Sequence, residues 1–514
     1  MTSFLKKEGL FVFLSTLYPF AFFMSVNSFK FSFLEFFKGI VIVELIISIA
    51  YFVMLFLIRK KHFHVKTNIS IAYSFLANAW IVRSFTVFGC PGLLKFILFY
   101  ISICVLSLFL SKKIKYLNII LIVVNIFAFG EYINNIRLEK SSYNELMSKI
   151  DKDSASNISF KTHPNVYYFY LESYQGKRGL TNIFHFDNSE FYKFLKNNGF
   201  DNYEDMCSNY NYTFASLSST FLMDHHFLKM DFGNSDTFSK FKNLLAGSND
   251  NLVVNCFRTN GYELNYFMDT ALFDKTINVE RSNLPKSNVG ILDMLLDNKE
   301  HIIKLNTLEA FLDEVFQTKK PQFTFIKFGG GFISSVRHAM PTAGNPELLP
   351  SYIREKFPDY KDYEKRRYKF LKKYYIDYVE ELKNGNEILK KLLQKIVKND
   401  PEAIIILLGD HGTNSIVEMS SSNVDVAIKD GISKKIIFDS FFDVMCSIRI
   451  PNLHKIDKKP VSSVNIFRYI FSILSNKAIP FKEDLSMTPF RIHMKSGDDI
   501  QYIDIKDYLK KEGR

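Results

Sequence analysis

Five apolar stretches before residue 135 constrain the fold of this chain more than any other feature. Each is close to the length of about 17–25 residues that a helix needs to cross a bilayer, and the last is the shortest. One such stretch is compatible with a signal peptide, whereas five in series are not. The stretches cover residues 10–26, 39–58, 69–88, 93–110 and 116–129. The sequence therefore predicts a membrane domain of about five α-helices over residues 1–133.

Basic residues cluster in alternate loops between these stretches. Lys6 and Lys7 precede the first stretch, and the loops after the second and fourth are also rich in Lys and Arg. Positively charged loops stay in the cytoplasm, so the N-terminus is predicted to lie inside. An odd number of crossings then places the chain after Glu131 outside. If one stretch is re-entrant rather than spanning, that orientation is reversed.

Two ionisable residues, Glu44 and Arg83, lie deep inside the apolar stretches. A charge within a bilayer is costly, so such residues are expected to pair internally or to have a function. Two interpretations stay open for them. They form a mutual pair that locks two helices together, or they contact a lipid headgroup.

Composition and charge differ strongly along the chain. Its 514 residues are too many for one ordinary domain, and the mean hydropathy of -0.01 averages an apolar first quarter with a polar, Lys-rich remainder. The formal net charge is +12, but Lys and Arg are spread out, without a basic stripe interleaved with aromatic residues. We therefore expect no nucleic acid partner, and we expect anionic lipid headgroups to balance the excess charge.

The chain has 5 Cys, and none of them belongs to a CxxC pair. This pattern argues against a zinc knuckle and against a disulfide framework. One bridge among Cys207, Cys256 and Cys446 stays open.

The region after the apolar stretches has the pattern of an α/β domain. Residues 134–163 are mixed and polar, which is typical of a linker with an amphipathic helix at the membrane surface. Short apolar runs follow at residues 166–171, 323–328 and 403–408, and a helical pattern covers residues 375–397. Unbroken apolar runs favour buried strands of a mainly parallel sheet covered by helices. We predict such a domain over residues 164–514, with ligands bound beyond the carboxyl ends of its strands.

Two of the predicted strands are followed by residues that commonly bind metals. Glu172 follows the first strand, and Asp410 and His411 follow the third. Two carboxylates and an imidazole suit zinc, with manganese as the alternative. Gly409 and Gly412 flank the second pair and would let the backbone turn sharply around an ion. Each motif alone is also compatible with an ordinary turn after a strand.

Thr213 precedes a helical pattern in the segment SNYNYTFASLSSTF, residues 208–221. One interpretation is a helix N-cap, a common use of Thr. The other is a nucleophile whose deprotonated form is favoured by a bound divalent cation and by the helix N-terminus. Residue patterns alone leave both open.

The order of these motifs resembles the membrane-anchored phosphotransferases of the alkaline phosphatase/sulfatase superfamily. These include the lipid A phosphoethanolamine transferases and the lipoteichoic acid synthases. TFASLS, at residues 213–218, is similar to the nucleophile segment T-A-x-S-[LV]-P, VYYFYLESY to the first strand, and LLGDHG to the metal-binding segment. Tyr375 to Tyr378 resembles a Y-x-D helix, and residues 463–474 resemble the late helix. The resemblance implies Thr213 as nucleophile and Glu172, Thr213, Asp410 and His411 as metal ligands.

The chain also departs from these families. The lipid A phosphoethanolamine transferases are rich in disulfides, whereas this chain has only 5 Cys, and it lacks the second His that follows their DHG segment. The segment GGGFISSVRHAMP, residues 329–341, lies where relatives place a substrate His, so His338 is predicted to bind substrate, with a solvated surface His as the competing interpretation. A sulfatase is not expected, because Cys207 is not followed by the Pro and Arg of a C/S-x-P-x-R motif.

The implied activity is a metal-dependent transfer of phosphoethanolamine or phosphoglycerol from a membrane phospholipid to a cell-envelope glycan or lipid, such as lipid A. The transfer would pass through a phospho-Thr213 intermediate. The protein is expected in the bacterial cytoplasmic membrane, with its catalytic domain in the periplasm or outside the cell. Two alternatives stay open: a membrane-anchored phosphodiesterase or sulfatase-like hydrolase, and a non-catalytic envelope scaffold. Fold alone does not identify the acceptor.

Overall fold

The chain divides into two compact units, one with Met1–Glu145 and the other with most of the chain from Leu146 onward. The structure, a computed structural model, describes helices, strands and loops in both units, and each is considered by itself. The described residues are 8–26, 33–59, 63–86, 114–149, 158–225, 251–268, 279–282, 305–328, 363–413, 433–453, 456–490 and 501–504.

The first unit is helical. Its described helices are α1 (Glu8–Val26), α2 (Phe33–Leu57), α3 (Phe63–Thr86) and α5 (Ile114–Lys149). Among the described residues, three helices are long and apolar enough to cross a membrane, namely α1, α2 and α5, which is fewer than the five expected. The predicted stretch at residues 69–88 forms most of α3, which is not among the three, and the stretch at residues 93–110 lies outside the described part of the chain. Helix α5 continues through Lys149, so the predicted linker begins as an extension of this helix. The boundaries at residues 133 and 163 stay predictions.

Polar side chains join the helices of this unit from within. Glu44 is buried and accepts a hydrogen bond from Thr16 Oγ1 at 3.0 Å. The amide of Asn125 donates to the carbonyl of Leu14 at 3.0 Å. Such bonds stabilise helix contacts where water is absent. The side chain of Arg83 lies outside the described residues, so its pairing with Glu44 stays a prediction.

The second unit is built on one seven-stranded sheet in the order β2-β7-β6-β1-β5-β3-β4. The run from β6 to β4 is parallel, and β7 pairs antiparallel with both β6 and β2. The strands are β1 (Val166–Leu171), β2 (Phe200–Asn202), β3 (Glu263–Met268), β4 (Arg281–Ser282), β5 (Gln322–Phe328), β6 (Ile404–Gly409) and β7 (Cys446–Arg449). A mainly parallel α/β sheet in this unit and apolar helices in the first unit confirm the predicted fold class.

The three predicted strands are the central ones. They correspond to β1, β5 and β6, and β1 lies between the other two. Every residue of β1 and β6 is buried, because helices cover both faces of the sheet. This is the environment in which strands read as unbroken apolar runs.

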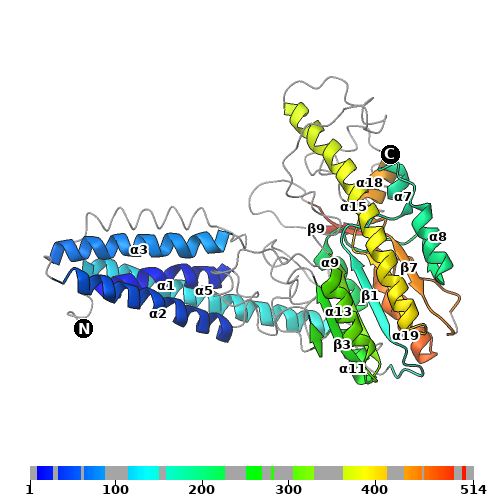
Figure 1. The fold of residues 1–514 in the computed structure, drawn as a ribbon, viewed down its shortest axis with the longest axis horizontal. Helices are drawn as coiled ribbons and strands as arrows, with labels where there is room; N and C mark the ends of the chain where they lie inside the picture. Colours follow the sequence, from blue (N-terminus) through cyan, green and yellow to red (C-terminus); the bar gives the residue numbers. More distant parts are fainter. Residues whose placement is uncertain are drawn as a thin grey trace. The chain divides into compact units, whose positions relative to one another are not determined.

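Helices pack on the two faces of the sheet (Figure 1). One face, with Tyr167, Phe169 and Leu171 of β1, forms a core with residues of α7, α8, α13, α15 and α18. The other face, with Tyr168 and Tyr170, meets Phe221 and Phe467 through ring contacts. The covering helices on the first face are α7 (Lys177–Asn182), α8 (Ser189–Asn197), α13 (Leu305–Phe316), α15 (Tyr363–Asn399) and α18 (Lys434–Phe442). Those on the second are α9 (Thr213–Leu222), α11 (Leu252–Thr259) and α19 (Ile466–Ser475).

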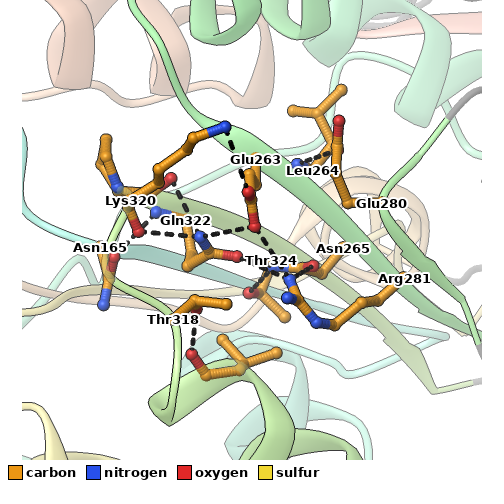
Figure 2. Close-up of polar contacts among 12 residues, drawn as sticks. Asn165, Glu263, Leu264, Asn265, Glu280, Arg281, Thr318, Lys320, Gln322 and Thr324 are labelled. Atoms are coloured by element: carbon orange, nitrogen blue, oxygen red, sulfur yellow. Dashed lines mark hydrogen bonds and ion pairs between the residues drawn. The ribbon is translucent and has the colours of Figure 1, made fainter.

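A network of polar side chains holds the amino ends of β3, β4 and β5 together. Figure 2 shows Asn265 donating to Gln322 Oε1 at 2.8 Å and Arg281 bonded to Glu263 and Asn265, each at 3.1 Å. These partners satisfy the buried amides of Asn265 and Gln322. The network lies at the opposite end of the parallel strands from Glu172 and Asp410, so it is part of the scaffold.

The three described cysteines, Cys207, Cys256 and Cys446, are free and buried. The bridge left open by the sequence is therefore not formed. Burial raises the pKa of the Cys256 thiol to about 12, which keeps this thiol neutral.

Candidate functional site

The sheet brings Glu172 and Asp410 to the same end of two adjacent strands. In the parallel pair of β1 and β6, Leu171 lies opposite Gly409, and Glu172 and Asp410 are the next residues along. On the other side of β1, Tyr170 lies opposite Lys327 of β5. We call this end of β1, β5 and β6 the carboxyl end of the sheet. The register therefore places Glu172 and Asp410 at the same edge of the sheet.

Asp410 is buried, and its two carboxylate oxygens have different surroundings. Oδ1 accepts backbone N–H groups from Ser173 at 2.6 Å and His411 at 2.7 Å. Oδ2 lies 3.4 Å from His411 Nε2 and has no hydrogen-bond partner among the described residues. A buried carboxylate oxygen without a partner is costly, and a cation would compensate it.

The electrostatics of Asp410 indicate the same need. Burial raises the pKa of Asp410 above its ordinary value, and the charge of Glu172 raises it further, whereas His411, the Ser173 N–H and the Thr213 hydroxyl lower it. The net direction is upward, so the ionised form is under-compensated in the chain alone. Four of the residues around this carboxylate thus influence its charge.

His411 presents one ring nitrogen to Thr213. Its Nδ1 lies 2.6 Å from the carbonyl oxygen of Gly412, which only accepts, so Nδ1 carries a proton. In the neutral ring this leaves Nε2 with a lone pair, and Nε2 lies 3.2 Å from Thr213 Oγ1. Asp410 Oδ2 and His411 Nε2 are therefore both directed toward the start of α9.

Thr213 is the first residue of α9, but its side chain does not cap the helix. The N-cap position belongs to Tyr212, without a side-chain cap bond. The Thr213 hydroxyl contacts His411 instead, and its carbonyl accepts the hydroxyl of Tyr170 at 2.9 Å. Of the two interpretations left open by the sequence, the N-cap is wrong. The role of nucleophile stays a proposal.

Glu172 pairs with Lys327, a residue that was not predicted to belong to the site. Its Oε2 accepts Lys327 Nζ at 3.1 Å, and Lys327 is almost completely buried. A signal was present, because Lys327 is the charged residue near the end of the apolar run FTFIKF. Its pairing depends on the register of β1 and β5, which residue patterns do not give.

The donor atoms of these residues are of the types that bind metals, but the side chains are not yet arranged around a common point. The orphaned Asp410 Oδ2, His411 Nε2 and the Thr213 hydroxyl are donors that suit zinc. However, no group of three or more His, Cys, Asp or Glu is close enough for metal binding among the described residues. The fourth expected ligand, Glu172, is held by Lys327. Binding of one ion by all four residues would require Glu172 to leave Lys327 and turn toward Asp410 and His411.

The turn after β1 is held by Tyr378 of α15. Ser173, with a positive φ of 53°, donates its N–H to Asp410 and accepts the Tyr378 hydroxyl on its carbonyl at 2.9 Å. The same hydroxyl accepts the N–H of Gln175 at 3.1 Å. Gln175 in turn accepts the N–H of Thr413 at 3.0 Å, beyond His411. One buried tyrosine thus links both loops of the site.

Replacing Tyr378 with Phe is expected to lower the free energy of unfolding by about 2 kcal/mol, because a buried N–H and carbonyl lose their partner. The Zn²⁺ affinity should fall as well, since the Ser173 N–H orients Asp410. Calorimetric Zn²⁺ titration and thermal unfolding measure the two effects. Tyr262→Phe is the control, because its hydroxyl donates to the Pro164 carbonyl just before β1. An equal loss of Zn²⁺ affinity in both variants would contradict the positioning role.

His338 lies outside the described residues, as does the whole segment of residues 329–341. Its role in binding substrate therefore stays a prediction.

No family model matches the sequence, and no curated protein matches it. Solved structures do resemble the fold. The C-terminal periplasmic domain of EcEptC from Escherichia coli has a TM-score of 0.40 at 10% identity, over 68% of this chain and 95% of that chain. Lipooligosaccharide phosphoethanolamine transferase A from Neisseria meningitidis has a TM-score of 0.38 at 14% identity, over 91% and 95%. The lipoteichoic acid synthase LtaP from Listeria monocytogenes has a TM-score of 0.38 at 15% identity, over 70% and 86%.

Proposed function

We propose that the protein is a metal-dependent phosphotransferase that moves a phosphoethanolamine or phosphoglycerol group from a membrane phospholipid to a cell-envelope glycan or lipid. The transfer passes through a phosphorylated Thr213. The observation that supports this most is the approach of Thr213 Oγ1 to His411 Nε2, 3.2 Å apart, beside the unpartnered Oδ2 of buried Asp410. A hydroxyl that contacts an imidazole at a helix start, beside a buried carboxylate, has the surroundings of an activated nucleophile.

Four residues are proposed to hold the ion, zinc or alternatively manganese: Glu172, Thr213, Asp410 and His411. When bound, the ion supplies positive charge that favours the ionised hydroxyl of Thr213. The protein itself orients the groups. Asp410 is fixed through Oδ1 by two backbone N–H groups, and His411 is fixed through Nδ1. Each therefore presents its second donor atom to the site, as outer hydrogen bonds do in metal centres.

Thr213 attacks the phosphorus of the donor in the first step. The bond from Oγ1 to phosphorus forms, and the bond from phosphorus to the diacylglycerol oxygen breaks. The proton of the Thr213 hydroxyl passes to water, and the departing diacylglycerol oxygen takes up one proton, for which we propose His338 as the donor. N–H groups in the first turn of α9 favour the negative charge near Thr213. In the second step an acceptor hydroxyl displaces Thr213, which regenerates the free side chain.

The helical unit is proposed to keep the enzyme at its substrates. The donor phospholipid and an acceptor such as lipid A both stay at the membrane, and three of the described helices of this unit are long and apolar enough to span it. We place the protein in the bacterial cytoplasmic membrane, with the sheet domain in the periplasm or outside the cell. The excess of positive charge on the cytoplasmic loops supports this orientation.

Intact-protein mass spectrometry tests the proposal. After incubation with Zn²⁺ and either phosphatidylethanolamine or phosphatidylglycerol, we expect an adduct with the mass of the corresponding phosphorylated headgroup, mapped to Thr213. The lipid that yields it identifies the donor. Lack of an adduct with both lipids, on protein that demonstrably holds zinc, would contradict the transfer mechanism in favour of hydrolysis or a scaffold without catalysis.

A further inference from the structure

Lys327 is a buried ammonium at the carboxyl end of the sheet. Its exposed fraction is 2%, and its Nζ lies 3.1 Å from Glu172 Oε2. Lysine is rarely this buried unless it is paired, because removing its charge from water is expensive. An apolar residue would fit the rest of β5, which reads as a buried strand. The charge at this position therefore calls for an explanation beyond the stability of the sheet.

The register of the strands places Lys327 on the face that carries Thr213. Its partner across the β1–β5 pair is Tyr170, and paired residues of parallel strands project to the same face. The hydroxyl of Tyr170 donates to the carbonyl of Thr213. Glu172 follows two residues after Tyr170 and reaches Lys327 directly. Lys327 thus lies among the residues proposed to hold the ion and the nucleophile.

The pairing of Lys327 with Glu172 suggests what this lysine does when the site is loaded. An ion that took up the carboxylate of Glu172 would leave the buried ammonium of Lys327 without its partner. A buried charge without a partner is costly, and a phosphate oxygen of the donor would compensate it.

We propose that Lys327 binds the phosphate of the donor, and this inference rests on the proposed function. In the absence of an ion, the ammonium is held by Glu172. When an ion takes up the carboxylate of Glu172, Lys327 turns to a phosphate oxygen of the phospholipid. The residue then competes with the ion at Glu172 and contributes to binding of the donor phosphate.

Two lysines near the ends of β5 provide a matched comparison. Lys327→Met removes the ammonium and keeps an unbranched apolar side chain. Lys320→Met does the same just before β5, where Lys320 Nζ lies 3.5 Å from Glu263 and the side chain is largely exposed. Lys327→Arg keeps the charge and is expected to rescue donor binding in part. All variants are made in the full chain.

Titration with Zn²⁺ alone is the first measurement. Lys327→Met is expected to bind Zn²⁺ roughly tenfold more tightly, because a positive charge about 3–4 Å from a ligand is removed. Lys320→Met should match the unmodified protein. Titration of the zinc-loaded proteins with inorganic phosphate is the second measurement, and Lys327→Met should bind it at least tenfold more weakly. The third is the rate of adduct formation on Thr213 with vesicles of the reactive phospholipid, which should fall while zinc occupancy is kept.

The outcomes separate this inference from the proposed function. Tighter Zn²⁺ binding with weaker phosphate binding supports it, even if no lipid forms an adduct and the transfer mechanism fails. Weaker Zn²⁺ binding by Lys327→Met would overturn it, because Lys327 would then hold Glu172 in place as a structural counter-ion. Unchanged phosphate binding would overturn it as well.

Discussion

Replacing Thr213 with alanine is expected to abolish transfer, with a loss of about 10⁴-fold or more, as when a nucleophile is removed from other covalent mechanisms. Alanine has no oxygen to form the bond to phosphorus. The loss should be chemical and not structural, because the Thr213 side chain does not cap α9 and its hydrogen bond is to His411. The measurement is headgroup transfer from the reactive phospholipid, with the adduct followed by mass spectrometry.

Two further variants serve as controls for the loss of the Thr213 hydroxyl. Thr213→Ser keeps a hydroxyl and should keep measurable transfer. Thr259→Ala removes an exposed hydroxyl that bonds only within α11 and should behave as the unmodified protein. Transfer by Thr213→Ala at a rate near that of Thr259→Ala would rule out the phospho-Thr213 intermediate.

Replacing Gly412 with alanine is expected to lower the free energy of unfolding by about 3 kcal/mol, at the upper end of the usual effect of overpacking. A Cβ at this position would collide with the carbonyl group of Ser440 and lie 2.9 Å from the carbonyl carbon of Phe441. These are backbone atoms at the end of α18 and have no room to move. The N–H of Gly412 is also bonded to the Phe441 carbonyl at 2.8 Å, which fixes the approach. Thermal unfolding should show a Tm lower by roughly 6 °C.

The same variant should also weaken Zn²⁺ binding, since His411 is anchored through the Gly412 carbonyl. Gly130→Ala is the control, because a Cβ at Gly130 meets nothing within 4 Å. A Gly412→Ala protein with unchanged Tm and unchanged Zn²⁺ affinity would show that the two backbones separate more easily than the structure indicates.

Central strands and strand-end residues were predictable because they depend on local patterns. A strand buried on both faces is apolar throughout, and β1, β5 and β6 have that pattern in the sequence. Parallel neighbours end at one edge, and the register of β1 and β6 places Glu172 and Asp410 at that edge, where ligands were expected to bind. Gly409 and Gly412 were expected to allow a sharp turn of the backbone around an ion, but the structure requires glycine at these positions for another reason. Neither Gly409 nor Gly412 has a positive φ, and close approach of another backbone excludes a side chain.

Contacts that depend on register or on distant helices were not predictable. The pair of Lys327 and Glu172 requires the alignment of β1 with β5. The link from Tyr378 to Ser173 requires the position of α15, which is set by packing and not by its own sequence. The choice for Thr213 between cap and contact with His411 depended on the backbone of Tyr212.

The position of β1 in the sheet governs when this domain can fold. β1 begins at Val166, but its two neighbours begin only at Gln322 and Ile404. The central strand therefore waits, apolar and unpaired, until most of the chain has been synthesised, and such long-range pairing folds slowly. A chain truncated before β6 would leave one edge of β1 open, and open apolar edges aggregate. We infer that the nascent chain depends on chaperone protection between synthesis of β1 and arrival of β6.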